Sequence, residues 1–330
     1  MAAGSQSLGN RARSSLDAVV GASAGGLLRL ARRFDRKKTA NGAAALLRKV
    51  GPWLPEHRTG RRNLRMAFPE KSDAEIERIL AGVWDNLGRF STDFAHLDRL
   101  TVYDPAVPGP GDIEYSPEAL ARFEQLRDSK QPVIMFAAHL ANWELPALVA
   151  HRYGVDAVVL YRRPNLGGVA DAAIAIRAGA MGTLVPTTRF APVTLGNALE
   201  SGRHVGMLVD QYYTRGVPIT FFGQPTRANP LLARLVRQFK CPIHGTRIIR
   251  LPGNRFRADM TGPIRPALTP EGDVDIGGTM QAVHDVIEGW IREYPEQWLW
   301  IHRRWRPDNK GPKSKREALA LGRAKSGLGG

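Results

Sequence analysis

Short apolar runs alternate with helix-like stretches from about residue 132 to residue 240, and this constrains the fold of the 330-residue chain more than any other feature. Each run is only a few residues long, which suits a strand buried on both faces, and several of the stretches between runs end at a glycine. This repeat of strand then helix predicts a largely parallel sheet. Strands are expected at 132–138, 156–162, 182–187 and 204–210, with helices at 143–154, 170–179, 192–202 and 230–240.

The segments on either side of the repeat complete the predicted fold. Residues 41–100 and 116–128 have helical patterns, and the Ser-Asp pair at 72–73 is expected to begin one of these helices. Residues 242–264 predict two strands around a Pro-Gly-Asn turn, and a last helix is expected at about 277–294. The predicted fold class is therefore α/β: a largely parallel, mixed sheet flanked by helices, with a helical N-terminal region.

The net charge of +16 is concentrated at the two ends of the chain. Residues 1–60 hold 11 Lys/Arg against 3 Asp/Glu, and residues 301–330 hold 9 against 2, so the 240 residues between them contribute only +1. Basic ends on a nearly neutral body suit an anionic partner such as a membrane surface, a nucleic acid or an acidic carrier. A nucleic-acid-binding protein is the less expected class, because the predicted sheet has no array of aromatic and basic residues.

The N-terminal segment predicts a helix that lies in a membrane interface. At helical spacing, one face carries Leu16, Val20, Leu27, Leu30, Ala31 and Phe34, and another carries Arg29, Arg32, Arg33 and Arg36. Three glycines between positions 21 and 26 weaken such a helix, so a frayed basic tail is the alternative. No stretch approaches the roughly 20 apolar residues that a helix needs to cross a bilayer.

Polar side chains follow three of the predicted strands. His139 stands directly after strand 132–138, Asp210 ends strand 204–210, and an arginine pair, Arg162 and Arg163, follows the apolar run 158–161 of strand 156–162. Ligands of α/β proteins bind beyond the carboxyl ends of the strands, so these side chains are expected to gather at one edge of the sheet. Asn142 is expected to cap the next helix, which would put Glu144 in its first turn and direct the helix N–H groups toward an oxyanion.

A histidine in this position is suited to act as a general base near neutral pH. It needs a carboxylate on its other ring nitrogen, and both Glu144 and Asp210 are candidates that the sequence does not separate. The chain has no Gly-x-Ser-x-Gly elbow, and its one cysteine, Cys241, is expected to be a small buried hydrophobe. A bound hydroxyl is therefore the expected nucleophile. Without a nucleotide-binding loop or metal-ligand spacing, no bound cofactor is expected.

The segment "HLANWE" (His139–Glu144) resembles the His-x4-Asp/Glu motif of the glycerolipid acyltransferase superfamily. Five further segments, "GRRNLRMAFPEKSDAEIERI", "YRRPN", "VDQYY…FFGQPT", "ARLVRQFKCPI" and "PEQWLWIHRRW", occur in the same order as in the late acyltransferases of lipid A biosynthesis. The resemblance covers about residues 45–308. It implies transfer of a fatty acyl chain from acyl carrier protein to a hydroxyl of a lipid A precursor. The implied location is the cytoplasmic face of the bacterial inner membrane.

Transferred to this sequence, the resemblance implies His139 as the base and Glu144 as the motif carboxylate. It matches Arg162 or Arg163 to the family's Tyr-Arg-Pro segment and the pair Asp210–Gln211 to its Asp-Gln/Asp-His segment, with Asp210 as a catalytic residue and the arginines and Gln211 as substrate-binding residues. Further candidate substrate-binding residues are Phe222 for the acyl chain, and Arg303 and Arg304 for phosphates. The sequence has "NLGG" (165–168) where the family has Asn-Pro, and its N-terminal helix is shorter. The acceptor therefore stays open, with a lysophospholipid or a glycolipid as rivals.

Three regions are expected in the chain. Residues 1–40 form a basic amphipathic membrane-associating segment, residues 41–308 the acyltransferase domain, and residues 309–330 a basic polar tail. The implied partners are acyl carrier protein, whose phosphopantetheine carries the acyl donor, an anionic lipid acceptor and the membrane surface, but no specific nucleic acid. Attachment to the membrane is expected to be peripheral or shallow.

Overall fold

A computed structural model describes Gly26 and residues 30–306 except 105, 108, 110, 130 and 163–166, without the side chains of residues 167–172. Its strands are β1 (Ile113–Tyr115), β2 (Ile134–Ala137), β3 (Ala157–Tyr161), β4 (Thr183–Pro186), β5 (His204–Leu208), β6 (Val217–Phe221), β7 (Gln224–Ala228), β8 (Ile243–Leu251) and β9 (Arg255–Ile264). Its helices are α2 (Arg36–Val50), α3 (Pro55–Ala67), α4 (Asp73–Ala95), α5 (Pro117–Asp128), α6 (Leu145–Arg152), α7 (Gly167–Ala178), α8 (Ala191–Glu200), α9 (Leu231–Phe239) and α10 (Ile276–Glu293), with short 3₁₀ turns such as η1 (Gly51–Trp53) and η4 (Pro295–Gln297).

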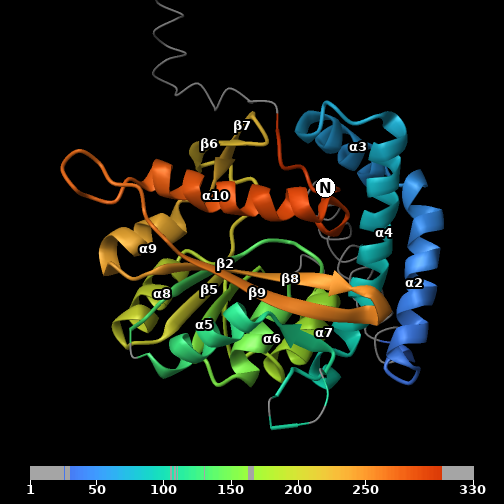
Figure 1. The fold of residues 1–330 in the computed structure, drawn as a ribbon, viewed down its shortest axis with the longest axis horizontal. Helices are drawn as coiled ribbons and strands as arrows, with labels where there is room; N and C mark the ends of the chain where they lie inside the picture. The colour runs from blue at the N-terminus through green and yellow to red at the C-terminus, as the bar shows by residue number, and fades with distance from the viewer. Residues whose placement is uncertain are drawn as a thin grey trace, which may run out of the picture.

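Seven of these strands form one mixed sheet in the order β1-β9-β8-β2-β5-β3-β4 (Figure 1). Strand β2 pairs in parallel with β5 on one side and β8 on the other, and β3 and β4 continue the parallel part. Strand β9 is antiparallel to β8 and parallel to β1. The predicted α/β fold with a largely parallel, mixed sheet is confirmed.

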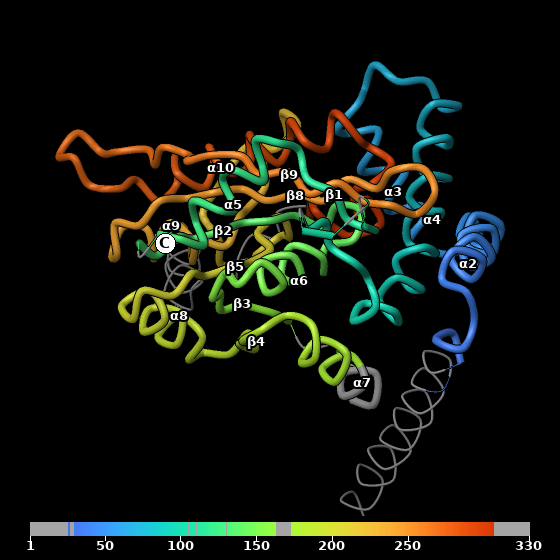
Figure 2. The backbone as a smooth tube through the Cα atoms, turned by 60° about the horizontal axis from the view of Figure 1, so that its bottom comes forward, coloured from blue at the N-terminus to red at the C-terminus, as the bar shows by residue number. Residues whose placement is uncertain are grey.

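Helices cover both faces of this sheet, which explains why the central strands are apolar throughout. Alternate residues of β2 point to opposite faces: Ile134 and Phe136 join the core beneath α8, α9 and α10, whereas Met135 joins the core beneath α5 and α6. Figure 1 shows α10 and α6 on opposite sides of β2, and Figure 2 shows β8, β2, β5, β3 and β4 following one another across the sheet. Because all four residues of β2 are buried, this strand gives a rigid base to the loop that follows it.

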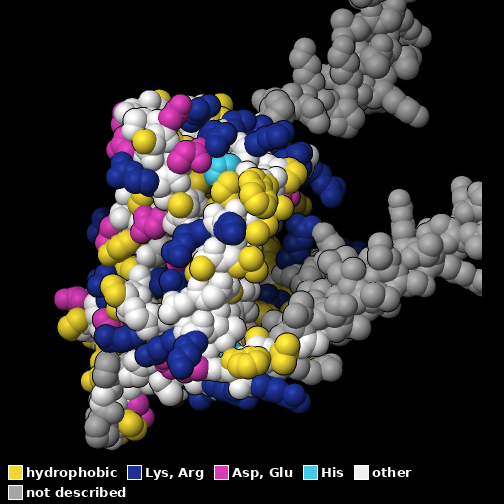
Figure 3. Space-filling view, turned by 90° about the vertical axis from the view of Figure 1, so that its right-hand side faces the viewer, with side chains coloured by type: hydrophobic (Ala, Val, Ile, Leu, Met, Phe, Trp, Pro, Cys, Tyr) yellow, Lys and Arg dark blue, Asp and Glu magenta, His cyan; other side chains and the backbone are white. Residues whose placement is uncertain are grey.

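The helices α2, α3 and α4 lie at one end of the molecule, beside the hairpin of β8 and β9 (Figure 1). Ser72 caps α4 as predicted, with a reciprocal hydrogen bond to Glu75. Arg36 forms ion pairs with Asp93 and Asp112, so the last residues of the predicted segment 1–40 belong to the folded body. Most of the predicted interfacial helix falls on residues 16–29, nearly all outside the described residues. Figure 3 looks onto this end, where hydrophobic side chains lie among lysines and arginines.

Two elements were not predicted. Strand β1 has only three residues, too few for a clear pattern. The hairpin of β6 and β7 contains Pro218 and Pro225, residues that are depleted in strands and are tolerated at sheet edges. Its turn places Phe222 and Gly223 at φ 52° and 68°, the positive angles of a tight hairpin turn that usually carries Asn-Gly. Within the part of the chain described, no helix has both the length and the apolar character needed to cross a bilayer.

Candidate active site

His139 and Asp210 meet at the carboxyl edge of the sheet, as predicted. His139 follows β2 and Asp210 follows β5, and the two strands are parallel neighbours with Ala137 opposite Leu208. His139 Nδ1 lies 2.7 Å from Asp210 Oδ1. The main-chain N–H of His139 donates to Asp210 Oδ2 at 2.8 Å, so one carboxylate orients both the ring and the backbone of the histidine.

Asp210 accepts a third hydrogen bond, from Trp298 Nε1 at 2.7 Å. Burial by itself raises the pKa of this carboxyl group. The charge of a protonated His139 and the hydrogen bonds from His139 and Trp298 outweigh burial, and they hold the pKa well below its ordinary value. An ionised carboxylate only accepts hydrogen bonds, so His139 Nδ1 carries the proton and Nε2 of the neutral ring has a lone pair.

The lone pair of His139 points toward the amide of Gln211. The distance from Gln211 Nε2 to His139 Nε2 is 3.1 Å, and both side chains line the same pocket. An amide donor at this distance occupies the place where the hydroxyl of a substrate would donate to the base. The atom of His139 that a base uses is therefore directed into the pocket rather than into the protein.

Glu144, the other candidate partner of His139, pairs with a different residue. Its two carboxylate oxygens accept from Arg177 Nη2 at 2.5 Å and Nε at 2.8 Å, and Glu144 is 7% exposed. The guanidinium of Arg177 also lies over the rings of Phe94 and Tyr161. Among the described residues, no hydrogen bond joins Glu144 to His139. Asp210 therefore orients the histidine, and Glu144 anchors α7 to the start of α6.

The loop between β2 and α6 is held in a strained conformation. Ala141 has φ 47°, a left-handed angle that is costly for a residue with a side chain. Two hydrogen bonds fix it: its N–H donates to the carbonyl of Gln297 at 2.8 Å, and its carbonyl accepts from Asn86 Nδ2 at 3.0 Å. Contacts from α4 and from the C-terminal segment thus set the direction in which the chain leaves His139.

The next helix begins later than expected, although the side chain of Asn142 accepts a hydrogen bond from the N–H of Glu144. Helix α6 begins at Leu145 with Glu144 as its N-cap residue, and Asn142 lies before it in the loop. The N–H groups of Glu144 and Leu145 donate to the side chain and the carbonyl of Asn142. Because these first N–H groups already have acceptors, the structure does not support the oxyanion role expected of them.

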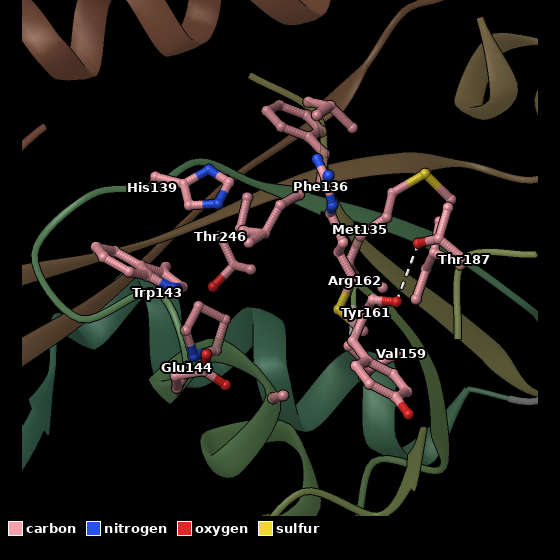
Figure 4. A pocket seen from close by; sticks show the side chains of 18 of the residues that line it. Met135, Phe136, His139, Trp143, Glu144, Val159, Tyr161, Arg162, Thr187 and Thr246 are labelled. Atoms are coloured by element: carbon pink, nitrogen blue, oxygen red, sulfur yellow. Dashed lines mark hydrogen bonds between the residues drawn. The ribbon is translucent and has the colours of Figure 1, made fainter. Parts of the chain in front are cut away.

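A pocket of about 650 Å³ opens beside His139 and runs between the sheet and helices α6 and α7. Its wall includes small residues from strands and helix, among them Ala137, Ala147, Ala150, Ala157 and Gly206, together with Met135, Val159 and Met181. Figure 4 shows His139, Trp143 and Glu144 on one side of the pocket and Tyr161 and Thr187 on the other. Its size is within the range of small-molecule sites, and its wall suits an aliphatic group.

A model of the bacterial lipid A biosynthesis acyltransferases matches residues 21–307 of the chain. The chain belongs to this family. No curated protein matches it at a significant level. Membership establishes the resemblance predicted from the sequence and makes the chain an acyltransferase. Its pocket and its His139–Asp210 pair are thus the natural place to look for acyl-transfer chemistry.

The acyltransferase places the remaining predicted residues in different surroundings. Arg162 is exposed and lines the pocket, whereas Arg163 lies outside the described residues. Phe222 is buried in an aromatic cluster with Phe68 and Trp300 and does not line the pocket, so an acyl-chain contact is not supported. Arg303 is exposed on the C-terminal segment.

Arg304 differs most from its prediction as a phosphate ligand. Its side chain has no exposed surface, and it donates to Thr226 Oγ1 and the carbonyl of Arg227 on β7. A side chain buried in this way does not reach a lipid phosphate, and the structure does not support that role.

Two residues that contact the site were missed. Trp298 was not singled out as a site residue; it is buried in the core, and its indole N–H donates to the carboxylate of Asp210. Arg177 was not singled out, although it is the one charged residue near the end of the otherwise apolar stretch "AAIAIRAG". A lone arginine in such an apolar helix, with Glu144 in the first turn of the preceding predicted helix, is the signal that would have drawn attention to it.

Proposed function

We propose that this lipid A biosynthesis acyltransferase takes its acyl chain from the thioester of acyl carrier protein and that His139 is the general base. The observation that carries the proposal is the orientation of one ring. Nδ1 of His139 is held by Asp210, while Nε2 faces Gln211 at the pocket. A neutral imidazole that is oriented by a carboxylate and open on its other nitrogen has the arrangement that base catalysis of acyl transfer requires.

The reaction begins when the acceptor hydroxyl takes the place of the Gln211 amide at His139 Nε2. As the hydroxyl oxygen attacks the thioester carbonyl carbon, its proton passes to Nε2, and Asp210 stabilises the imidazolium that forms. The tetrahedral intermediate then collapses: the carbon–sulfur bond breaks, and the leaving thiolate takes the proton back from His139. The histidine returns to its neutral form, so the protein carries no covalent intermediate.

The pocket between the sheet and α6 suits the acyl chain of the donor. It includes residues of β3 from Tyr161, near the carboxyl edge, to Ala157 at the other end of the strand. Four residues of strand span about 13 Å, so a chain that enters beside His139 can extend well into the protein. Burial of each methylene contributes about 0.8 kcal/mol, which makes such a pocket a strong source of binding energy for a fatty acyl group.

Positive charge near the pocket and at one end of the molecule supports anionic partners. Arg162 is exposed at the pocket, where a phosphate of the lipid or of the carrier's phosphopantetheine would lie close to the reacting atoms. At the helical end, Phe34 and Trp53 are 60% and 77% exposed, and Lys37, Lys49 and Arg58 of α2 and α3 are exposed as well. Figure 3 shows hydrophobic side chains among lysines and arginines at this end. Exposed aromatic and basic side chains are typical of a surface that sits on anionic lipid, which supports peripheral attachment to the inner membrane.

The test is acyl transfer by the purified full chain, with acyl-acyl carrier protein as donor and a lipid A precursor in vesicles, followed by mass spectrometry of the lipid. His139→Ala should lower turnover by about 10²–10⁴-fold, the usual contribution of a general base. His151→Ala is the matched control, because this histidine is exposed on α6 and makes no hydrogen bond with the pair. Turnover of His139→Ala near that of the wild type would remove the histidine from the mechanism. Equal use of a soluble acyl thioester without the carrier would remove the carrier as the specific donor.

A further inference from the structure

Arg304 is a wholly buried cation with no carboxylate partner among the described residues. Other deeply buried arginines of the described chain form ion pairs, for example Arg250 with Asp93 at 2.7 Å and Arg177 with Glu144 at 2.5 Å. Arg304 has no exposed surface, and only its Nη1 atom donates, to Thr226 Oγ1 at 2.9 Å and to the carbonyl of Arg227 at 3.0 Å. Its Nε and Nη2 atoms have no hydrogen-bond partner within the described ranges.

Such an arrangement destabilises the folded state, because removing a charged group from water is strongly unfavourable unless a partner offsets the lost hydration. The guanidinium does lie over the ring of Phe221, with 5.0 Å from Cζ to the ring centroid, which recovers part of this cost. A hydrophobic side chain of similar volume would fill the same space without a desolvation cost. Packing alone therefore does not explain an arginine at this position.

The guanidinium of Arg304 lies over the ring of Phe221, whose centroid is 5.9 Å from that of Trp298, and Trp298 Nε1 donates to Asp210 at 2.7 Å. Asp210 is the carboxylate whose charge acts on Arg304. Burial lowers the pKa of Arg304 to about 10, and the charge of Asp210 opposes this change. His284 of α10 lies in the same region. Burial and then the charge of Arg304 lower the pKa of His284 to about 3, so His284 is neutral and supplies no positive charge to balance Asp210. The permanent positive charge in this buried layer is thus that of Arg304.

We propose that Arg304 is a positioning residue of the catalytic pair, whose buried charge balances that of Asp210 and limits how tightly His139 holds its proton. This inference rests on the proposed function, because it assigns the charge to the base of that reaction. With Arg304 present, the negative charge of Asp210 is balanced by the charge of Arg304 while His139 is neutral. When His139 takes the proton of the acceptor, the added positive charge is matched by the oxyanion, and the proton is readily returned to the leaving thiolate.

Several other titratable or charged groups surround the pair and must be distinguished from Arg304. They are His302, Arg306 and Tyr212 on the segments after η4 and β5, His284 on α10, Arg162 after β3, and the ion-paired Glu144 and Arg177 on the pocket wall. Burial lowers the pKa of His302 to about 4, so this side chain is neutral near pH 7. Arg162 and Arg306 are exposed, where solvent and salt screen their charges.

The experiment measures the titration of the His139 ring by NMR, with the signal assigned from its loss in His139→Ala, together with the pH dependence of transfer. Arg304→Met removes the charge, and loss of a cation favours protonation of His139. The titration midpoint and the acid limb of the rate should both move to higher pH by about one unit. Arg304→Lys keeps the charge, so the titration midpoint and the acid limb should each move by no more than about a third of a pH unit.

A second variant covers the case in which Arg304→Met does not fold. Thr226→Asp gives the guanidinium a carboxylate at the position of its present partner, so it neutralises the charge without removing the arginine. It should raise the midpoint in the same direction, whereas Thr226→Val, which only removes the hydrogen bond, should leave it unchanged. An unchanged midpoint in folded Arg304→Met or in Thr226→Asp overturns the inference, as does an equal shift in Arg304→Lys. Absence of transfer in the wild type counts against the proposed function instead, because the NMR titration does not depend on turnover.

Discussion

Replacement of Asp210 by asparagine is the sharpest perturbation of the proposed catalytic pair. The side chain keeps nearly the same shape but loses its charge. In the wild type, the carboxylate accepts from His139 Nδ1, from the His139 main chain and from Trp298 Nε1. The amide oxygen of asparagine can serve two of these three donors, and its NH₂ group then faces the remaining donor. The ring of His139 is also free to bind through the other tautomer, which would turn a protonated nitrogen toward the substrate.

The size of the effect follows from the geometry. Opposite unit charges separated by 2.7 Å interact by about 6 kcal/mol at an effective dielectric constant near 20, which corresponds to roughly 4.5 powers of ten in rate. A general base contributes only about 10²–10⁴-fold, so the whole of that interaction cannot appear in the rate. We therefore expect kcat to fall by about 10³–10⁴-fold. We expect the free energy of unfolding to fall by about 1–3 kcal/mol, the cost of one unsatisfied buried donor.

Two measurements test this reasoning: the pH dependence of acyl transfer, and urea unfolding for stability. Loss of the Asp210 charge disfavours the imidazolium, so the acid limb of the rate should move to lower pH, opposite to the shift expected for Arg304→Met. Glu144→Gln is the matched control, because it alters the motif carboxylate that pairs with Arg177. Its effect should fall on stability and KM, with the acid limb unmoved. The reasoning is refuted if Glu144→Gln moves the acid limb while Asp210→Asn keeps kcat within tenfold of the wild type.

Three further predictions concern the pocket, the buried histidine and the membrane surface. Gly206→Val should narrow the pocket and shift the preferred donor to shorter acyl chains, with kcat/KM falling at least tenfold for each methylene that no longer fits, as measured with a series of acyl-acyl carrier proteins. The new Cβ would meet Val159 Cγ2 at an ordinary 3.6 Å, so the variant should fold, and an unchanged preference would place the acyl chain elsewhere. Burial, then the charge of Arg304, lowers the pKa of His284 to about 3, so the unfolded chain binds an extra proton below about pH 6.5. Wild-type stability should then fall by up to about 1.4 kcal/mol per pH unit from pH 6 to 4, and urea unfolding should show a smaller slope in His284→Asn. Trp53→Ser should weaken sedimentation with anionic vesicles without changing thermal stability, because the side chain is 77% exposed; unchanged sedimentation would exclude this residue from the contact.

The fold and part of the site could be predicted because their signals are local. A short apolar run such as that of β2 is buried on both faces, and the helix after it has its own periodicity, so strand and helix are both evident from neighbouring residues. The approach of His139 and Asp210 followed from a general property: the carboxyl ends of neighbouring parallel strands lie at one edge. The prediction required only that β2 and β5 be adjacent, which they are.

The contacts that were missed join residues far apart in the chain. Trp298 lies 88 residues after Asp210 and reaches it only because the C-terminal segment returns along the β2 loop. Arg177 lies 33 residues after Glu144, on a helix whose place beside α6 depends on the sheet order. Arginine is usually a surface residue, and Arg304 is buried because the C-terminal segment packs against β6 and β7. No local pattern contains this information, because each contact depends on how distant elements are arranged.

The spacing of the motif itself explains why its two ends serve different purposes. Four residues separate His139 from Glu144, and one of them, Ala141, has a left-handed conformation that turns the chain sharply after β2. The histidine stays at the carboxyl edge of the sheet, while the glutamate is carried to the start of α6, where it binds Arg177 on α7 beside the apolar pocket. One short loop therefore holds the imidazole proposed as the base and closes the pocket wall. We expect a change in the wall that moves α6 to move His139 as well, so that this loop would couple the fit of the proposed acyl chain to the position of the base.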